Sequence, residues 1–313
     1  LVPKNLCAKV PEGVNLDDAV FTVLSSIALQ GIRLINPTLG ETITVMGLGL
    51  VGQLTVDLLK ANGCKVIAMD IDKGRVSSSN KLGVEGVHLS KDINLPNEVD
   101  QLTKGKGVDG VLITANSTSD LIIKQAANIS RKRGRIVLVG VSGLNISRDD
   151  FYEKELTFQV SCSYGPGRYE PEYEEGGLDY PIGFVRWTEQ RNFEAILDLM
   201  KQGSFNPSRL ITKRFKLHDS TTEYDASIQS KDNLGILIDY PKSEIDPDYA
   251  NNSNEATEFS LPIDHSISPV IGLIGSGEYG RRVLIPILKK QKADLRIISS
   301  QMGLSGVFTA KDN

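Results

Sequence analysis

The feature that most constrains the fold is the segment 42–63, TITVMGLGLVGQLTVDLLKANG. Its first residues are apolar and β-branched, which is typical of a buried strand. A glycine-rich turn follows at once and leads directly into a helical pattern. The segment therefore predicts a strand over 42–46, a tight turn, and a helix over 50–61, with Gly63 as the left-handed C-cap.

Three glycines stand in this turn at the spacing G-x-G-x-x-G, namely Gly47, Gly49 and Gly52. In a dinucleotide-binding turn the first glycine permits the tight bend, the second lets the backbone approach the pyrophosphate, and the third lets helix and strand pack closely. The following helix begins at Leu50 and Val51, where unpaired N–H groups and the positive end of the helix dipole attract phosphate. The glycine spacing therefore predicts a pyrophosphate site; the alternative is a purely structural turn.

An acidic residue indicates which dinucleotide this turn prefers. A second strand, 65–69, ends at Asp70, which follows Gly47 at close to the roughly 20-residue offset at which an acid meets the adenosine ribose. A carboxylate there accepts hydrogen bonds from the ribose hydroxyls and repels a 2′-phosphate, so the sequence favours NAD. Lys73 and Arg75 follow closely and leave NADP open.

Short apolar runs continue to alternate with helical patterns up to Gly140, as buried parallel strands do. The predicted helices cover 16–34, 73–82, 98–103 and 119–129, and the predicted strands cover 86–89, 108–114 and 135–139. Strands that alternate with helices imply right-handed crossovers in one sheet. We therefore expect an α/β fold, a doubly wound parallel sheet of the Rossmann type.

Residues 142–190 differ from the preceding part, because they carry many glycines, prolines and tyrosines and little periodicity. A long irregular section inside a compact domain is usually functional. Its candidates for a substrate or subunit surface are Tyr164, Arg168, Tyr180, Arg186 and Trp187, with a packed structural loop as the alternative. A helix over 192–201, a strand over 210–217, a helix from Asp219 to Gln229 and a strand over 234–240 are predicted to follow.

Beyond these elements, 241–266 has the polar, acidic composition of a linker. A second strand–turn–helix pattern then places Gly275, Gly277 and Gly280 at the same spacing as the first three glycines. The strand predicted after it ends in Ser299-Ser300 and carries no acid, which is compatible with a 2′-phosphate or with loose selection. We expect a second dinucleotide-binding domain that is truncated, and hence a fragment of a longer protein.

Composition and residue spacing exclude several other classes. A net charge of −4 makes nucleic acid an unsuitable partner, and no apolar run reaches the roughly 18 residues that span a bilayer. Three scattered cysteines and no signal peptide indicate reduced thiols in the cytoplasm. The histidines, His88, His218 and His265, are isolated, so no metal site is predicted, and no G-x-S-x-G nucleophile motif occurs. The basic run 131–135 is interpreted as a solvated turn.

With these motifs in place, the chain resembles the medium-chain dehydrogenase/reductase family over about residues 1–240. The resemblance is carried by VPEGV at 10–14, AVFTVLSSIALQGIR at 19–33, the segment 44–72, GVDGVLITA at 107–115 and RGRIVLVGV at 133–141. It implies that 16–204 form the NAD(P)-binding domain and that 1–15 and 205–240 are remnant and return segments of a GroES-like catalytic domain. No cysteine stands around 21–25, where such proteins often supply a zinc ligand, so the likeness implies a zinc-independent member.

The same resemblance assigns further residues to the cofactor. Thr22 is expected to approach the nicotinamide side, and Ala115, Asn116, Gly140 and Val141 are expected to flank the nicotinamide ribose and ring. It also implies a homodimer paired through the edge of the sheet, while the catalytic residues remain unknown.

The segment PVIGLIGSGEYGRRVL from position 269 resembles the start of a Gfo/Idh/MocA-family oxidoreductase, which implies a truncated domain over 267–313. The two segments together resemble bi-domain oxidoreductases, which are often associated with surface-polysaccharide biosynthesis. The implied activity is NAD(P)-dependent hydride transfer with an alcohol or carbonyl substrate, and the likeness to the bi-domain group implies a sugar-related one. A non-catalytic dinucleotide-binding or assembly module is the alternative, and a stand-alone zinc-free quinone reductase is disfavoured by the second glycine turn.

Overall fold

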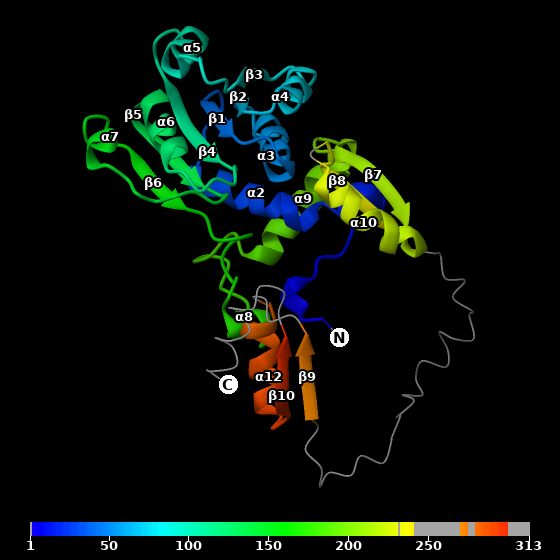
Figure 1. Ribbon diagram of the computed structural model, residues 1–313. Coiled ribbons are helices and arrows are strands. Elements are labelled where there is room, and N and C mark those ends of the chain that lie inside the picture. Colours follow the sequence, from blue (N-terminus) through cyan, green and yellow to red (C-terminus); the bar gives the residue numbers. More distant parts are fainter. Residues whose placement is uncertain (1, 231, 241–269, 275–278, 300–313) are drawn as a thin grey trace. The chain divides into compact units, whose positions relative to one another are not determined.

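The computed structural model describes residues 2–230, 232–240, 270–274 and 279–299 (Figure 1). The chain divides into two units, Leu1–Pro241 and Lys242–Asn313, which are described separately below. The predicted linker 241–266, His265, Ser300 and the glycines Gly275 and Gly277 lie outside the described residues. Within the described ranges, no helix is both long enough and apolar enough to cross a bilayer.

A six-stranded parallel sheet forms the centre of the first unit. Its strands are β1 Thr42–Met46, β2 Lys65–Asp70, β3 Glu85–His88, β4 Val108–Ile113, β5 Ser130–Leu138 and β6 Thr157–Val160. They lie in the order β3-β2-β1-β4-β5-β6, and every neighbouring pair is parallel. This is the strand order of a dinucleotide-binding Rossmann sheet, so the predicted fold class is confirmed.

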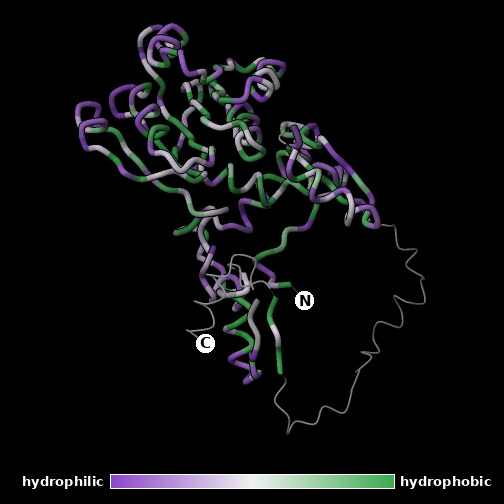
Figure 2. Tube along the Cα trace, viewed as in Figure 1, coloured by the Kyte–Doolittle hydropathy of each residue, from purple (hydrophilic) through white to green (hydrophobic). Residues whose placement is uncertain are grey.

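Helices cover both faces of the sheet. They are α2 Thr22–Ile35, α3 Leu50–Ala61, α4 Lys73–Asn80, α5 Leu95–Thr103, α6 Leu121–Ile129 and α9 Glu189–Lys201. Successive strand residues point to opposite faces, so Val45 packs in the core with α2, α3 and α9, while Met46 packs in a second core with α5 and α6. Figure 2 shows the outer helix α5 as largely hydrophilic.

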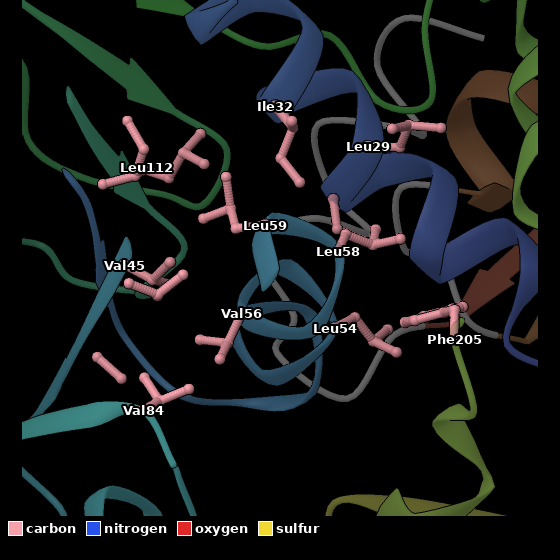
Figure 3. Packing of buried hydrophobic residues seen from close by; sticks show 14 of the residues in the cluster. Leu29, Ile32, Val45, Leu54, Val56, Leu58, Leu59, Val84, Leu112 and Phe205 are labelled. Carbon is pink, nitrogen blue, oxygen red and sulfur yellow. The ribbon is translucent and has the colours of Figure 1, made fainter. Parts of the chain in front are cut away.

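Helix α3 connects the first glycine turn to the core. Its residues Leu54, Val56, Leu58 and Leu59 are at most 3% exposed, and they lie among side chains of β1, β4 and α2 (Figure 3). Each fully buried leucine stabilises the fold by on the order of 2 kcal/mol. The helix N-terminus is therefore held rigidly at the end of β1.

The predicted helix over 16–34 is interrupted. Asn15 caps a short helix, α1 Leu16–Ala19, by accepting a hydrogen bond from the Asp17 backbone N–H at 3.0 Å. The chain then bends before α2, where the Thr22 hydroxyl donates to the Ala19 carbonyl at 2.6 Å. The apolar stripe continues through this bend, which is why periodicity alone predicted one helix.

The prediction of an aperiodic section over 142–190 is wrong in part. It contains α7 Arg148–Tyr152, the sixth strand β6 and the short helix α8 Pro171–Glu174. Strand β6 has only four residues, with polar side chains among them, and lies at the edge of the sheet. An edge strand of this kind has no continuous apolar run to reveal it.

The interpretation of 131–135 as a solvated turn is also wrong, since these residues belong to β5. The Arg131 guanidinium Nε donates to the Asp109 carboxylate at 2.6 Å, and Arg135 donates to Glu41 at 2.5 Å. These partners stand on other strands and connections, so the local charge pattern could not identify them.

The remaining elements of the first unit include a small sheet of two parallel strands. These remaining elements are η1 Lys4–Leu6, η2 Pro207–Leu210, β7 Ile211–Lys216, η3 Leu217–Asp219, α10 Ser220–Gln229 and β8 Gly235–Asp239. Strands β7 and β8 pair in parallel across α10. The phenyl ring of Phe21 lies close to Gly235, so this small sheet packs beside the start of α2.

The second unit contains strand β9 Val270–Ile274, a π-helical turn η4 Gly280–Leu284, helix α12 Ile285–Lys290 and strand β10 Asp294–Ser299. The two strands pair in parallel, as the sequence predicts for a strand–turn–helix–strand segment. Gly280 begins the helical part.

Candidate functional site

A cavity of about 470 Å³ opens at the carboxyl ends of β1, β2 and β4. Ligands of open parallel α/β sheets bind at this edge, where the strand order reverses. Six of the residues predicted to bind cofactor line it together: Gly47, Gly49, Asp70, Arg75, Ala115 and Asn116. Residues that are distant in sequence thus meet in one place.

Two of the three glycines are required by the fold itself. Gly47 has φ +100°, and a Cβ built on it would lie 2.5 Å from the Ala115 backbone nitrogen. A Cβ on Gly52 would lie 1.9 Å from the Gly47 carbonyl oxygen. A side chain at Gly47 would therefore push the turn away from the segment after β4, and one at Gly52 would force α3 away from β1.

Gly49 differs, because a Cβ there would have no neighbour within 4 Å. No contact with another described residue requires this glycine, and it faces open space in the cavity lining. It is also the N-cap of α3, whose first backbone N–H groups have no acceptor inside the helix. The space in front of Gly49 is thus a cradle for an anionic group, and the residues present fit a pyrophosphate.

Asp70 is only 6% exposed, yet its carboxylate is well satisfied. One oxygen accepts from the Leu48 backbone N–H at 2.5 Å and the other from the Asp72 backbone N–H at 2.8 Å. The Arg75 guanidinium is farther away, at 4.0 Å. Because each carboxylate oxygen can accept more than one hydrogen bond, Asp70 keeps capacity for a hydroxyl in the cavity.

The sequence analysis missed the apolar walls of this cavity. They are formed by Ile71, Leu89, Leu121 and Ile122. Ile71 is 78% exposed and Leu121 is 55% exposed, so both present apolar surface at the open cavity. A planar aromatic base would cover both of them. Their exposure arises only on folding. The position of Ile71 directly after Asp70 is the one sequence feature that could have placed it at the cavity.

Polar groups complete the cavity between β4 and α6. They are Thr114, Ser117, Ser119 and Gln125. The Thr114 hydroxyl donates to the Gly47 carbonyl at 2.6 Å, so it fixes the glycine turn instead of remaining free for a ligand.

Other predicted residues lie outside the cavity lining, namely Leu50, Val51, Gly52, Lys73, Thr22, Gly140 and Val141. Leu50 and Val51 pack against the core, and Lys73 is exposed at the start of α4. Val141 forms a parallel bridge with Asn116, and a Cβ on Gly140 would lie 2.1 Å from the Ala115 carbonyl oxygen. These two therefore support the cavity wall from β5.

The aromatic and basic residues of 161–188 contact one another rather than this cavity. The Arg168 guanidinium lies 3.9 Å from the Tyr169 ring centroid and donates to Glu174 at 2.5 Å. Tyr180 stacks on Tyr173. Arg186 stacks on Trp187.

A buried carboxylate lies beneath this segment, at the start of α9. Glu189 is fully buried, and neither of its carboxylate oxygens has a hydrogen-bond partner among the described residues. Burial, with a contribution from the charge of Glu174, raises the pKa of Glu189 to about 7, although Arg168 opposes the shift. Sequence analysis did not identify Glu189, because its burial depends on residues far away in the chain.

No metal centre forms among the described residues, in the sense that no three histidine, cysteine, aspartate or glutamate side chains are grouped to hold an ion. The His88 ring nitrogen lies 3.0 Å from the Ile71 carbonyl oxygen, and His218 pairs with Asp219. The residues described here therefore do not fit a zinc ion.

Comparison with known proteins agrees with this geometry. Residues 51–176 match the family model of zinc-binding dehydrogenases. The chain is 26% identical over 241 residues to (R,R)-butanediol dehydrogenase of Bacillus subtilis strain 168, covering 76% of this chain and 62% of that protein. It thus spans less than two thirds of the length of this relative.

Solved structures show the same fold. The structure of 2R,3R-butanediol dehydrogenase from Bacillus subtilis matches with a TM-score of 0.60 at 26% identity, over 74% of this chain and 60% of that one. An alcohol dehydrogenase of E. coli CFT073, solved with the cofactor NADH, matches with a TM-score of 0.59 at 22% identity, over 74% and 61%. The segment 51–176 therefore carries the zinc-binding dehydrogenase match, within a Rossmann fold shared with the alcohol dehydrogenases.

Proposed function

We propose that this chain is the NAD(H)-binding part of an oxidoreductase that transfers a hydride between nicotinamide and an alcohol or carbonyl substrate. The observation that carries the proposal is the cavity at the sheet edge, where open space at Gly49, the start of α3 and the Asp70 carboxylate meet. The similarity to butanediol dehydrogenase supports the reaction class.

Each part of the cavity has a role in this proposal. The first N–H groups of α3 hold the pyrophosphate in front of Gly49, and Asp70 accepts hydrogen bonds from the adenosine ribose. Ile71 and Leu121 cover the two faces of the adenine. When bound, the nicotinamide supplies the hydride, while the protein orients it and excludes water. Asn116 lines the end of the cavity that this ring would use, and Val141 supports it through their bridge.

The arrangement favours NAD over NADP. The Asp70 carboxylate is held in place by two backbone donors, so it cannot turn away from an added phosphate. A 2′-phosphate there would meet a buried negative charge, with the Arg75 guanidinium 4.0 Å from the carboxylate. The repulsion between a 2′-phosphate and the Asp70 carboxylate should therefore weaken NADP binding by more than the attraction of the partly exposed Arg75 guanidinium strengthens it.

We also propose the domain arrangement that the sequence predicts. In it, 16–204 bind the cofactor, 1–15 and 205–240 belong with a GroES-like catalytic domain, and 267–313 begin a second, Gfo/Idh/MocA-like domain after the linker. The sugar-related substrate rests on the resemblance to bi-domain oxidoreductases. No step is assigned to zinc, because the described residues do not group to hold it.

A non-catalytic dinucleotide-binding module is the second candidate. It is favoured by the cavity lining, in which Asp70 and Arg75 are the only ionisable side chains among the described residues. Asp70 is engaged by the backbone, so a general acid or base would have to come from elsewhere. Turnover of an alcohol by the chain would decide against this second candidate.

Fluorescence titration with NADH and NADPH tests the proposal. Asp70→Ala should weaken NADH binding by about tenfold or more, because a charged hydrogen-bond acceptor for the ribose is lost. NADPH binding should be unchanged or stronger. A variant that has simply lost its fold would weaken both ligands, so the opposite responses distinguish a cofactor role from a structural one.

Asp198→Asn is the matched control, since Asp198 is an exposed carboxylate on α9 outside the cavity. It should bind both dinucleotides as the wild type does. Unchanged NADH affinity in Asp70→Ala would show that Asp70 does not bind the adenosine ribose.

A further inference from the structure

The Arg33 side chain, on α2, carries a positive charge that no carboxylate neutralises in the ranges that the structure describes. Its guanidinium carbon lies 3.4 Å from the centroid of the Trp187 indole ring. Its Nε donates to the Asn192 side-chain oxygen at 2.7 Å, and this amide oxygen is a neutral acceptor. By contrast, the guanidinium groups of Arg131 and Arg209 each donate to an aspartate.

The two contacts hold the Arg33 guanidinium by its face and by one edge. Its two Nη groups have no hydrogen-bond partner among the described residues. Burial, together with the charge of Arg186, lowers the pKa of Arg33 to about 10. A partly buried charge without a partner costs free energy, so an anion that reaches the Nη groups would be bound favourably.

A cavity of about 250 Å³ lies against this guanidinium group. Arg33 is the one charged side chain among its described lining residues, and Asn36 and Asn62 add side-chain amides. The rest of the described lining is apolar and is supplied by Leu29, Ile32, Pro37 and the Trp187 ring. The cavity thus combines one positive group and two neutral donors with an apolar surface.

This cavity is separate from the one at Gly49. Asn36 and Asn62 are the C-caps of α2 and α3, and these helices lead into β1 and β2. The cavity therefore lies beside the amino ends of these strands, whereas Gly49 and Asp70 line the cavity at carboxyl ends. The two cavities have no described lining residue in common, so a ligand here would be distinct from the dinucleotide.

We propose that this cavity binds a small monocarboxylate with an aliphatic tail. The two Nη groups of Arg33 form a fork that matches the two carboxylate oxygens, while the amides of Asn36 and Asn62 add neutral donors. The tail packs on Leu29 and Ile32. A single cation favours a single negative charge, because the second charge of a phosphate would have no partner in a partly apolar cavity. The volume restricts the ligand to a small molecule.

Trp187 is the only tryptophan of the chain and lines the cavity, so its fluorescence reports binding. Titration of the full chain with sodium butyrate at constant ionic strength should give a saturable change. Acetate should bind about tenfold more weakly, because two methylene groups are lost from the apolar contact. Butyramide, which has the same tail without the charge, and sodium phosphate should give no saturable change. Saturation-transfer NMR on the butyrate methyl protons provides a readout that does not depend on the indole.

Arg33→Gln is the decisive variant, and butyrate affinity should fall about tenfold or more, because a charged hydrogen-bond donor is lost. Since Arg33 also contacts Trp187 and Asn192, a second variant should leave these contacts in place. Asn62→Ala does so, because the Asn62 side chain is exposed and its one described hydrogen bond is a contact of 3.7 Å with the Cys64 sulfur. It should weaken butyrate binding about threefold.

Arg148→Gln is the matched control, since Arg148 also stacks on an aromatic ring, that of Tyr152 at 3.7 Å, but lies outside the cavity lining. It should bind butyrate as the wild type does. A linear response to butyrate, an equal response to butyramide, or tighter binding of phosphate would each overturn the proposal. So would full butyrate affinity in Arg33→Gln, or in Asn62→Ala should Arg33→Gln fail to fold.

Discussion

Asp70 and Glu189 are both buried carboxylates, but they differ in the hydrogen-bond donors around them. Asp70, at the end of β2, receives two backbone N–H groups and faces a cavity. Glu189, at the start of α9, is fully buried, and within the part of the chain that the structure describes neither oxygen has a hydrogen-bond partner. The Asp70 carboxylate is thus satisfied by hydrogen bonds, whereas burial raises the pKa of Glu189 to about 7.

The difference lies in what the surrounding backbone supplies to each carboxyl group. Around the glycine turn, backbone N–H groups hold the Asp70 carboxylate in place and leave it acceptor capacity that a ligand can use. Around α9, the folded segment 161–188 covers a carboxyl group without supplying donors, and this costs free energy whenever the group ionises. The predictions below test whether the first region is a ligand site and the second a source of pH dependence, from the largest expected effect to the smallest.

The largest effect is expected from Gly52→Ala. The new methyl group would lie 1.9 Å from the Gly47 carbonyl oxygen, so α3 must move away from β1. The free energy of unfolding should fall by at least ~3 kcal/mol, as measured by urea denaturation. A loss below about 1 kcal/mol would mean that the close contact of helix and strand is not required.

The second effect concerns pH and Glu189. The pKa of Glu189 is higher in the folded chain than in the unfolded one. Its contribution to the free energy of unfolding is therefore fully present below about pH 4 and is lost as the pH rises through about 7. Glu189→Gln removes the charge, and at pH 8 it should be about 2–3 kcal/mol more stable than the wild type.

Urea denaturation from pH 5 to pH 8 measures this difference. Glu194→Gln is its control, because Glu194 is an exposed glutamate of the same helix. Parallel pH profiles of the wild type and Glu189→Gln would show that Glu189 has an ordinary environment.

Gly49→Ala should separate binding from stability. A methyl group at Gly49 meets nothing within 4 Å, so the free energy of unfolding should change by less than about 1 kcal/mol. NADH affinity should nevertheless fall about tenfold, because the methyl group occupies the space proposed for the pyrophosphate. Isothermal titration calorimetry measures the affinity, and full NADH affinity in this variant would show that the cradle is not used.

Arg75→Gln should have the smallest effect on stability. The guanidinium is 4.0 Å from the Asp70 carboxylate, whereas the two backbone donors are within 2.8 Å. The free energy of unfolding should change by less than about 0.5 kcal/mol in urea denaturation. A loss several times larger would indicate that Arg75, rather than the backbone, holds the Asp70 carboxylate in place.

The sequence predicted those parts of the molecule that depend on local patterns. The alternation of apolar strands with helices predicted the sheet, and the glycine spacing with Asp70 predicted the centre of the cavity. The short edge strand β6 and the ion pairs of Arg131 and Arg135 were missed, because their partners stand on other elements. The exposure of Ile71 and the burial of Glu189 likewise arise only after folding.

Hydrogen exchange measured by mass spectrometry, with and without NADH, tests the central claim most directly. Binding at the proposed cavity should slow amide exchange in peptides that cover 47–53 and 70–75, because these peptides contain the lining residues Gly47, Gly49, Asp70, Ile71 and Arg75. Exchange in 270–290, which carries the second glycine pattern, should stay unchanged. Absence of slowing at both places, or slowing confined to 270–290, would contradict the assignment of the first glycine turn as the NAD(H) site.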